Sequence, residues 1–224
     1  MISKVSASPD LLIQRAVKDF ESLVTQLMES KSSIRVLLTG GTLGIDFIRA
    51  MREVDIDFSR ITLMFSDERF VALDHPDRNE HQAIVVFPGL EHYLTRYPAS
   101  DIPLDEAREQ LESQLEPIFE DGNGIDLTIL GIGPDGHVAS LFPEHAEPGR
   151  WVIAEANSPK PPSERLSLSY AALEQSKRVW FLASGAQKAW AVSEGMKKAS
   201  VPASRVRGTE ETVWYLDQEL SDEL

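Results

Sequence analysis

Short apolar runs alternate with segments of helical periodicity along most of the chain. Each run has the length and the β-branched content of a buried strand, and polar or glycine-rich residues follow most of them. A helix is expected after Ser8, where apolar residues recur with helical spacing from Ile13 to Met28, and another over 45–51. Strands are expected at residues 34–38, 61–65, 126–130, 151–156, 165–169, 178–183 and 212–216.

The order of these elements indicates the fold class. Strands that alternate with helices build βαβ units, which place the strands parallel and cover both faces of the sheet. Strands that are apolar at almost every position agree, because both of their faces are then buried. The sequence therefore predicts an α/β fold with a mostly parallel sheet, helices on both faces and a single domain over residues 1–224. Residues 142–165, rich in Pro, Glu and Ser, are the longest expected loop, either a lid or an inert excursion.

Composition and charge exclude several classes of protein. Apolar residues make up 42% of the 224 residues, which is enough for a sizeable core. The net charge of −14 disfavours nucleic acid and anionic membranes as partners, so an anionic ligand needs a local cluster of cations. The chain has no cysteine, which excludes disulfides and thiolate metal sites. It has no apolar run of membrane-spanning length and no signal-peptide pattern at its start, so the expected location is the cytoplasm.

Four polar clusters follow directly after apolar runs. The carboxyl ends of parallel strands lie at one edge of a sheet, where α/β proteins bind ligands, so these clusters are expected to converge. The first cluster, residues 39–44, reads TGGTLG and leads into the helix over 45–51. Its glycines let the backbone approach a ligand, and the free N–H groups of the helix attract an anion. A plain tight turn is the alternative, since the loop matches no nucleotide-binding motif.

Cations stand out in two further clusters. Arg69 ends a run of three charged residues and is suited to grip a phosphate with two hydrogen bonds. Arg165 and Lys188 belong to the last cluster, where Lys188 lies one turn into the helix expected after residues 184–185. Each of these residues alone is more typical of a solvated surface, so their convergence is what would indicate a phosphate site.

The remaining cluster ends on a histidine. Residues 131–137 read GIGPDGH, a tightly specified turn that places His137 at the edge of the sheet. An imidazole titrates near neutral pH and is suited to general acid–base catalysis, although a lone histidine is often structural. The other histidines show no metal-binding spacing, and no G-x-S-x-G motif supports a serine hydrolase. Neither a metal site nor a serine nucleophile is therefore expected.

Taken together, the loops resemble the glucosamine-6-phosphate isomerase/6-phosphogluconolactonase family, from about residue 37 to about residue 216. The motifs that carry the resemblance are TGGT (39–42), SDERFV (66–71) with Arg78-Asn79, DLTILGIGPDGHVASLFP (126–143), SPKPPSERLSLS (158–169) and ASGAQK (183–188). The resemblance implies a Rossmann-like sheet and, without any cofactor, hydrolysis of 6-phospho-D-glucono-1,5-lactone to 6-phosphogluconate in the oxidative pentose phosphate pathway. A small phosphorylated lactone is then the expected partner, and a monomer is the default oligomeric state.

The resemblance also implies roles for single residues. His137 would act as general base, with Asp67 or Asp135 orienting its ring; each aspartate is as well explained by hydrogen bonds that fix its own turn. The residues implied to bind the substrate or its phosphate are Gly40, Gly41, Thr42, Arg69, Arg165 and Lys188. Leu43 departs from the family pattern, which has a hydroxyl side chain there, so one phosphate contact is expected to be lost or made by the backbone.

Two other functions stay open. Glucosamine-6-phosphate deaminases share the G-x-G-x-D-G-H turn, but they typically have a tyrosine where this chain has Arg69. They also run toward Asn-Glu-Pro after the histidine, where this chain reads Val-Ala-Ser-Leu-Phe-Pro. A non-catalytic sugar-phosphate sensor would need an output domain, for which 224 residues filled by one sheet leave no room. The lactonase is therefore the expected activity.

Overall fold

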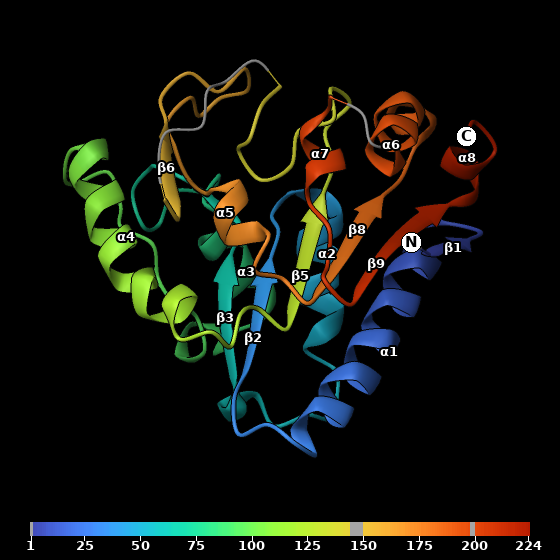
Figure 1. The fold of residues 1–224 in the computed structure, drawn as a ribbon, viewed down its shortest axis with the longest axis horizontal. Helices are drawn as coiled ribbons and strands as arrows, with labels where there is room; N and C mark the ends of the chain where they lie inside the picture. The colour runs from blue at the N-terminus through green and yellow to red at the C-terminus, as the bar shows by residue number, and fades with distance from the viewer. Residues whose placement is uncertain (1, 144–149, 198–199) are drawn as a thin grey trace.

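A six-stranded sheet forms the centre of the computed structural model, which describes residues 2–143, 150–197 and 200–224 (Figure 1). The strands follow the order β1-β9-β8-β5-β2-β3, and every neighbouring pair is parallel. The predicted α/β fold with a mostly parallel sheet is therefore confirmed. The strands are β1 (Ile2–Ser6), β2 (Ile34–Leu38), β3 (Ile61–Phe65), β5 (Leu127–Gly131), β8 (Arg178–Ala183) and β9 (Glu211–Asp217).

Helices cover both faces of this sheet. Successive residues of a strand point to opposite faces, so each strand contributes side chains to both halves of the core. In β2, Val36 and Leu38 pack into the half of the core that contains the buried sides of α1 and α2. Leu37, between them, packs into the other half, which contains the buried side of α4. The helices are α1 (Pro9–Met28), α2 (Gly41–Met51), α3 (Asn79–Val86), α4 (Leu104–Glu120), α5 (Tyr170–Leu173), α6 (Ala189–Met196), α7 (Pro202–Arg205) and α8 (Gln218–Ser221), with short 3-10 helices η1 (Phe58–Arg60), η2 (Leu90–His92) and η3 (Ala186–Lys188).

The first helix confirms its sequence signals. Ser8 caps it, because its Oγ accepts a hydrogen bond from the N–H of Leu11 at 3.3 Å, and Pro9 occupies the first helical position. The residues that α1 buries are the apolar ones at helical spacing: Leu12, Ile13, Ala16, Val17, Phe20 and Val24. Burial of this face ties α1 to the same half of the core as α2.

A second sheet of three antiparallel strands, in the order β4-β7-β6, lies apart from the first. Its strands are β4 (Asp67–Arg69), β6 (Val152–Glu155) and β7 (Arg165–Leu168). The strands predicted at 151–156 and 165–169 therefore exist, but they do not join the parallel sheet. The register places Arg69 opposite Arg165. Two polar clusters that are far apart in the sequence are neighbours for this reason.

Helices α3 and α4 and strand β1 are absent from the sequence predictions. β1 is an edge strand with no fully buried side chain, so it has no apolar run to detect. Residues 142–165 contain β6 and are not one continuous loop. The prediction of a lid falls partly on residues 144–149, which lie outside the described residues. The missed helix α4 has apolar residues at helical spacing and buries Ala107, Leu111, Leu115 and Phe119.

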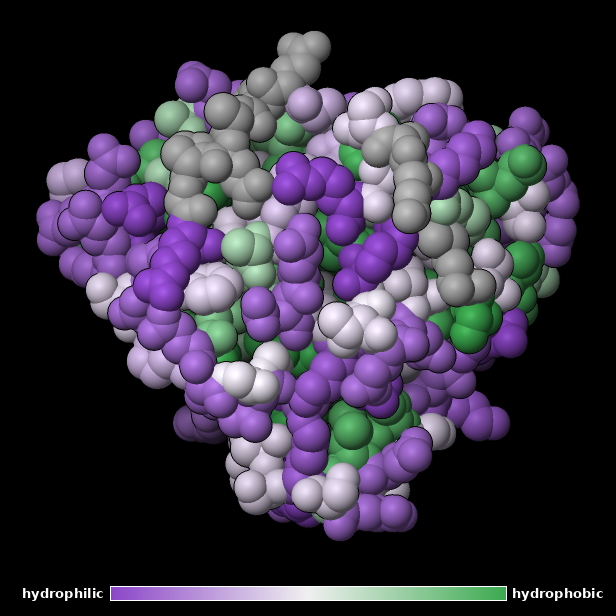
Figure 2. All heavy atoms as spheres, in the orientation of Figure 1, coloured by the Kyte–Doolittle hydropathy of each residue, from purple (hydrophilic) through white to green (hydrophobic). Residues whose placement is uncertain are grey.

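The surface is mostly polar. Figure 2 shows hydrophilic residues over most of the face seen in Figure 1, as expected for a chain of net charge −14. Over the described ranges, no helix combines the length and the apolar character needed to cross a membrane.

Candidate active site

A cavity of about 610 Å³ opens at the carboxyl edge of the parallel sheet. The loops that follow β2, β5 and β8 line it, together with residues of β4 and the segment 160–165. All four polar clusters meet there, as their positions after apolar strands predict. The expected site residues that line the cavity are Gly40, Gly41, Thr42, Asp67, Arg69, His137, Arg165 and Lys188. Asp135 lies just behind it, in contact with His137.

His137 is held in place by its neighbours. Oδ1 of Asp135 lies 2.5 Å from Nδ1 of the imidazole, and the ring of Phe142 lies 4.8 Å away, measured between ring centroids. Gly133 leaves the space for the imidazole, because a Cβ at this position would come within 2.1 Å of the ring. With Nδ1 engaged, Nε2 is the nitrogen available for proton transfer.

The surroundings of His137 favour its neutral form. Burial lowers the pKa of the imidazole and the charge of Lys160 lowers it further, whereas Asp135 and Asp67 act in the opposite direction. The net decrease makes the ring a neutral base at physiological pH. For Asp135, burial alone would raise the pKa, but the charge of His137 and the hydrogen bonds to the carboxylate produce a net decrease. An ionised Asp135 therefore fixes the tautomer that carries its proton on Nδ1.

Asp67 has different partners. Its Oδ2 accepts a hydrogen bond from Ser140 Oγ at 2.6 Å and lies 3.7 Å from Nη1 of Arg165. It makes no hydrogen bond with His137 in the part of the chain that the structure describes. Of the two aspartates expected to orient the imidazole, Asp135 is the one in contact with it, and Asp67 instead fixes Ser140 and Arg165 at the cavity.

Arg69 and Arg165 lie opposite each other on β4 and β7. Like charges in this position destabilise a sheet unless other groups compensate them. Asp67 compensates Arg165, whose Nε and Nη2 also donate to two carbonyl oxygens of the preceding loop, at 3.2 and 3.0 Å. Arg69 donates from Nη1 to the carbonyl oxygen of Asp77 at 2.5 Å, but its buried Nε has no partner among the described residues. Both arginines therefore keep donor capacity for an anion, because Nη1 of Arg165 makes only the 3.7 Å ion pair with Asp67.

Two lysines add to the positive charge of the cavity. Lys188, at the end of η3, and Lys160, in the loop before β7, both line it. Burial lowers the pKa of the Lys188 ammonium and the charge of Lys160 lowers it further, against the effect of Asp217. Within the described ranges, neither ammonium forms a hydrogen bond or an ion pair. Two ammonium groups that repel each other in one cavity are suited to an anion with two negative charges, such as a phosphate monoester.

Lys160 is a site residue that the sequence predictions omit. Its loop is held by a 3.0 Å hydrogen bond from the N–H of Ser158 to the carbonyl oxygen of Ser163. The carbonyl oxygen of Lys160 itself accepts a hydrogen bond from Nη2 of Arg165 at 3.0 Å. The backbone is therefore fixed and the side chain is left for the cavity. The signal was present in the sequence as the lysine of the SPKPPSER motif.

The glycine loop and the start of α2 form another wall of the cavity. The first N–H groups of α2, which begins at Gly41, and the dipole of this helix favour an anion at this end. Gly40 is required because Asn79 packs against it: a Cβ at Gly40 would come within 1.9 Å of Asn79 Oδ1. Nδ2 of Asn79 donates to the carbonyl oxygen of Asp67 at 2.9 Å. Leu43 lines the cavity without a hydroxyl group, as expected.

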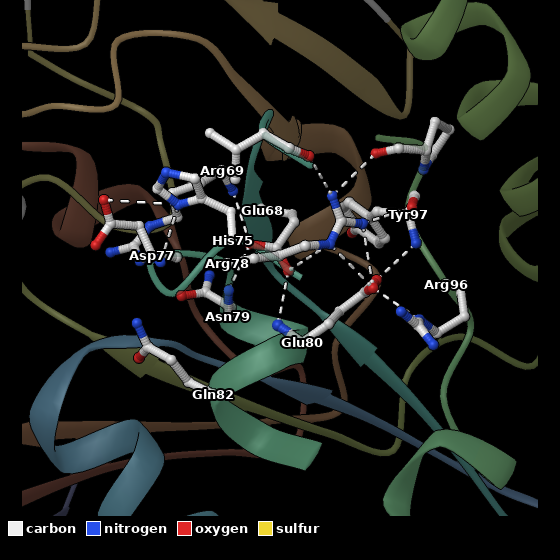
Figure 3. A network of polar contacts seen from close by, with 12 residues as sticks. Glu68, Arg69, His75, Asp77, Arg78, Asn79, Glu80, Gln82, Arg96 and Tyr97 are labelled. Atoms are coloured by element: carbon white, nitrogen blue, oxygen red, sulfur yellow. Dashed lines mark hydrogen bonds and ion pairs between the residues drawn. The ribbon is translucent and has the colours of Figure 1, made fainter. Parts of the chain in front are cut away.

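A buried polar network supports these walls from behind (Figure 3). Oε1 of Glu68 accepts hydrogen bonds from the N–H groups of Arg69 and Asn79, both at 2.7 Å. Its Oε2 accepts one from the N–H of Glu80 at 2.8 Å. Arg78, fully buried, donates to Glu80 at 3.1 Å and to three backbone carbonyl oxygens. Burial raises the pKa of Glu68 to about 8, although Arg78 opposes this effect. The network fixes two cavity-lining residues without itself reaching the cavity.

The chemistry available in the cavity follows from this inventory. The described residues contain no group of three or more His, Asp or Glu side chains suited to hold a metal ion. They do offer a neutral imidazole backed by a carboxylate, four cations and a helix N-terminus. Such a set is suited to a phosphorylated substrate that reacts with the help of a general base.

Comparison with known proteins identifies the family. The profile of glucosamine-6-phosphate isomerases/6-phosphogluconolactonase matches residues 7–214. A 6-phosphogluconolactonase of Mycobacterium leprae is 36% identical over 93% of this chain and 92% of its own length. The crystal structure of the 6-phosphogluconolactonase of Thermotoga maritima has a TM-score of 0.86 and 29% identity, and the match covers 97% of this chain and 99% of that one. A monomeric glucosamine-6-phosphate deaminase, with a TM-score of 0.79 and 20% identity, shares the fold. The chain belongs to the glucosamine-6-phosphate isomerase/6-phosphogluconolactonase family.

Proposed function

We propose that this protein hydrolyses 6-phospho-D-glucono-1,5-lactone to 6-phosphogluconate. The observation that carries the proposal is a neutral histidine, held by Asp135, in the same cavity as four cations of a protein with net charge −14. Lactone hydrolysis needs a base that activates water, and the phosphate needs cations. Relatives named 6-phosphogluconolactonase, at 31–36% identity over more than nine tenths of the chain, support the same activity.

The reaction begins at His137. Neutral His137 takes a proton through Nε2 from a water molecule as that water attacks C1 of the lactone. The carbonyl electrons move to the carbonyl oxygen, which becomes an oxyanion. When the carbonyl re-forms, the bond between C1 and the ring oxygen breaks, and protonated His137 returns its proton to the ring oxygen. Asp135 stabilises the imidazolium between these steps, because its carboxylate contacts Nδ1.

The phosphate is assigned to the cationic part of the cavity. Lys160 and Lys188 carry ammonium groups without carboxylate partners in the described part of the chain, and Arg69 keeps a free Nε. The glycine loop, residues 40–42, adds backbone donors at the start of α2. Arg165 contributes positive charge while its nitrogens hold Asp67 and the 158–163 loop. Binding at this end places C1 of the lactone near His137.

The test compares two substrates. The purified protein is incubated with the phosphorylated lactone, and 6-phosphogluconate is measured after subtraction of spontaneous hydrolysis. A parallel incubation with glucosamine 6-phosphate is assayed for ammonia. Saturable lactone hydrolysis without ammonia supports the proposal. Ammonia without lactone hydrolysis would instead assign the deaminase activity, and binding of both sugars without turnover would assign a sensor.

Five of the expectations drawn from the sequence remain predictions. These are the location in the cytoplasm, the monomeric state, the extent of one domain over residues 1–224, the role in the oxidative pentose phosphate pathway and the independence from any cofactor. Light scattering of the purified protein measures the oligomeric state, and activity after exhaustive dialysis against a chelator tests the need for a metal.

A further inference from the structure

Ala139 has a backbone conformation that alanine rarely adopts. Its φ is +51°, and no other non-glycine residue in the described ranges has a positive φ. Such a conformation is strained for a residue with a Cβ, and it persists only where the surroundings impose it, often at functional sites. Ala139 lines the cavity and stands two residues after His137. The strained residue therefore belongs to the same site as the base.

The surrounding 138–141 turn is anchored on its other sides. A 2.9 Å hydrogen bond from the N–H of its last residue to the carbonyl oxygen of its first residue closes the turn. The N–H of Ser140 donates to Ser167 Oγ at 3.1 Å, and Ser140 Oγ donates to Asp67 at 2.6 Å. These bonds tie the turn to β7 and β4. Its conformation is imposed before any substrate arrives.

The N–H of Ala139 is a backbone donor of this turn that has no hydrogen-bond partner among the described residues. Among the hydrogen bonds of the described residues, none has this group as its donor. In a β-turn the N–H of the second residue lies outside the ring that the turn's own hydrogen bond closes, so it cannot be satisfied within the turn. Ala139 is a partly buried residue, and backbone N–H groups that are removed from water normally have a partner. Ala139 lines the cavity, so a ligand bound there is the candidate partner for this N–H.

We infer that the backbone N–H of Ala139 forms the oxyanion hole of this site, an assignment that rests on the proposed lactone hydrolysis. Water attacks C1 and gives its proton to His137, and the carbonyl electron pair moves onto oxygen, where the N–H of Ala139 donates a hydrogen bond to the negative charge. As the pair returns, the ring oxygen leaves and takes the proton from His137. A donor whose direction is already fixed needs no reorganisation when the charge develops, so it stabilises the transition state more than the ground state.

The test removes this one donor. Stop-codon suppression places lactic acid at position 139 of the full chain, so that an ester oxygen replaces the N–H while the methyl group and the backbone path remain. The expected result is a fall in kcat on the order of 10²–10³, the usual effect of one oxyanion-hole donor, with little change in KM. The acid limb of the pH profile stays in place, because His137 and its neighbours are unaltered.

A matched control accounts for the side effect of the ester. The ester at 139 weakens the carbonyl of Val138 as an acceptor, and this carbonyl closes the turn with the N–H of Leu141. Leucic acid at position 141 removes the same hydrogen bond from its donor side and leaves the N–H of Ala139 intact. A much larger fall in kcat for the 139 ester than for the 141 ester supports the inference. Equal falls for the two esters, or a kcat at 139 like that of the wild type, overturn it.

The substitution Ala139→Gly separates the donor from the side chain. Glycine keeps the N–H and tolerates a positive φ but holds the turn less rigidly, so kcat is expected to fall far less than in the 139 ester. Loss of activity in this variant comparable to that of the 139 ester would show that the methyl group matters and would overturn the assignment. Failure of the proposed function is distinguishable, because the wild-type protein itself would then show no lactonase activity.

Discussion

His137 shows how a turn of small residues produces a chemical property. Gly133 leaves the space that the imidazole fills, and Asp135 engages Nδ1. Burial and the charge of Lys160 then keep the ring neutral. The position, the tautomer and the pKa of the proposed base are all set by residues within or directly beside the same cavity.

Replacement of His137 tests the base directly. His137→Ala is expected to lower kcat by roughly 10²–10⁴, the usual contribution of one positioned general base. KM changes little, because the cations that hold the phosphate remain. The measurement is the initial rate of lactone hydrolysis over a range of substrate concentrations, corrected for the spontaneous reaction at each pH. A folded variant with near-normal kcat would refute the mechanism and leave Asp67 or Asp135 as the base.

At the level of elements, the short strand β4 supplies three successive side chains to different tasks. Asp67 holds Ser140 and Arg165, Glu68 binds the first N–H groups of α3, and Arg69 reaches the cavity. The hydrogen bonds from the start of α3 to Glu68 also position Asn79 against Gly40, and this contact links α3 to the glycine loop. The geometry of the phosphate end therefore depends on the packing of β4 and α3 behind the glycine loop.

The contact between Gly40 and Asn79 gives a test at this scale. Gly40→Ala forces a methyl group against the buried carboxamide of Asn79, so the variant is expected to lose about 1–3 kcal/mol of unfolding free energy and to bind substrate more weakly. The double variant Gly40→Ala/Asn79→Ala removes the clash and regains part of both losses. Thermal unfolding and KM are the measurements.

A nearby glycine provides the control for this pair. A Cβ at Gly131 meets its nearest neighbouring atom only at 3.7 Å, so Gly131→Ala is expected to be tolerated although this residue also lines the cavity. If Gly40→Ala is as stable as Gly131→Ala, or if the double variant is no better than Gly40→Ala alone, the proposed link between α3 and the glycine loop is wrong.

How far the sequence predicts the fold depends on how each element is buried. Strands such as β2 and β8 lie inside the parallel sheet, so they are apolar at nearly every position and their pattern is clear. β4 has only three residues, all charged, and is recognisable as a strand only through its pairing with β7. The antiparallel sheet was therefore not predictable as a separate unit from local pattern.

How far the sequence predicts the site depends on whether a residue directly follows a strand of the parallel sheet. Residues that follow a strand directly, such as His137, are placed at the sheet edge by topology and are predictable. The choice of Asp135 over Asp67 as the partner of the imidazole depends on side-chain packing that no motif encodes. Lys160 lies in a loop that follows no strand of the parallel sheet, and hydrogen bonds of Arg165 and Ser158 hold that loop at the cavity.

At the scale of the whole molecule, the distribution of charge matters more for substrate binding than the net charge does. The chain carries a net charge of −14, which repels a phosphorylated substrate at long range, yet its fold gathers four cations from three segments around one cavity. The cations concerned are Arg69, Lys160, Arg165 and Lys188. One of them also acts on other groups: Lys160 lowers the pKa of both His137 and Lys188. Substrate binding and the state of the base are therefore coupled through a single lysine.

Lys160→Met tests this coupling, because it removes the charge and keeps much of the apolar length. A charge-assisted contact to phosphate contributes about 1.5–3 kcal/mol, so KM is expected to rise roughly ten- to a hundredfold. The groups that act on the imidazole are Asp135 and Asp67, which favour its protonated form, and Lys160, which disfavours it. Loss of the lysine charge therefore raises the pKa of His137, and the acid limb of the rate profile moves to higher pH. Lys160→Arg keeps the charge and should leave the acid limb in place. Lys197→Met removes the charge of a lysine whose side chain is 63% exposed, and it should also leave the acid limb in place. An acid limb that is the same in Lys160→Met and in the wild type would show that Lys160 does not act on the base.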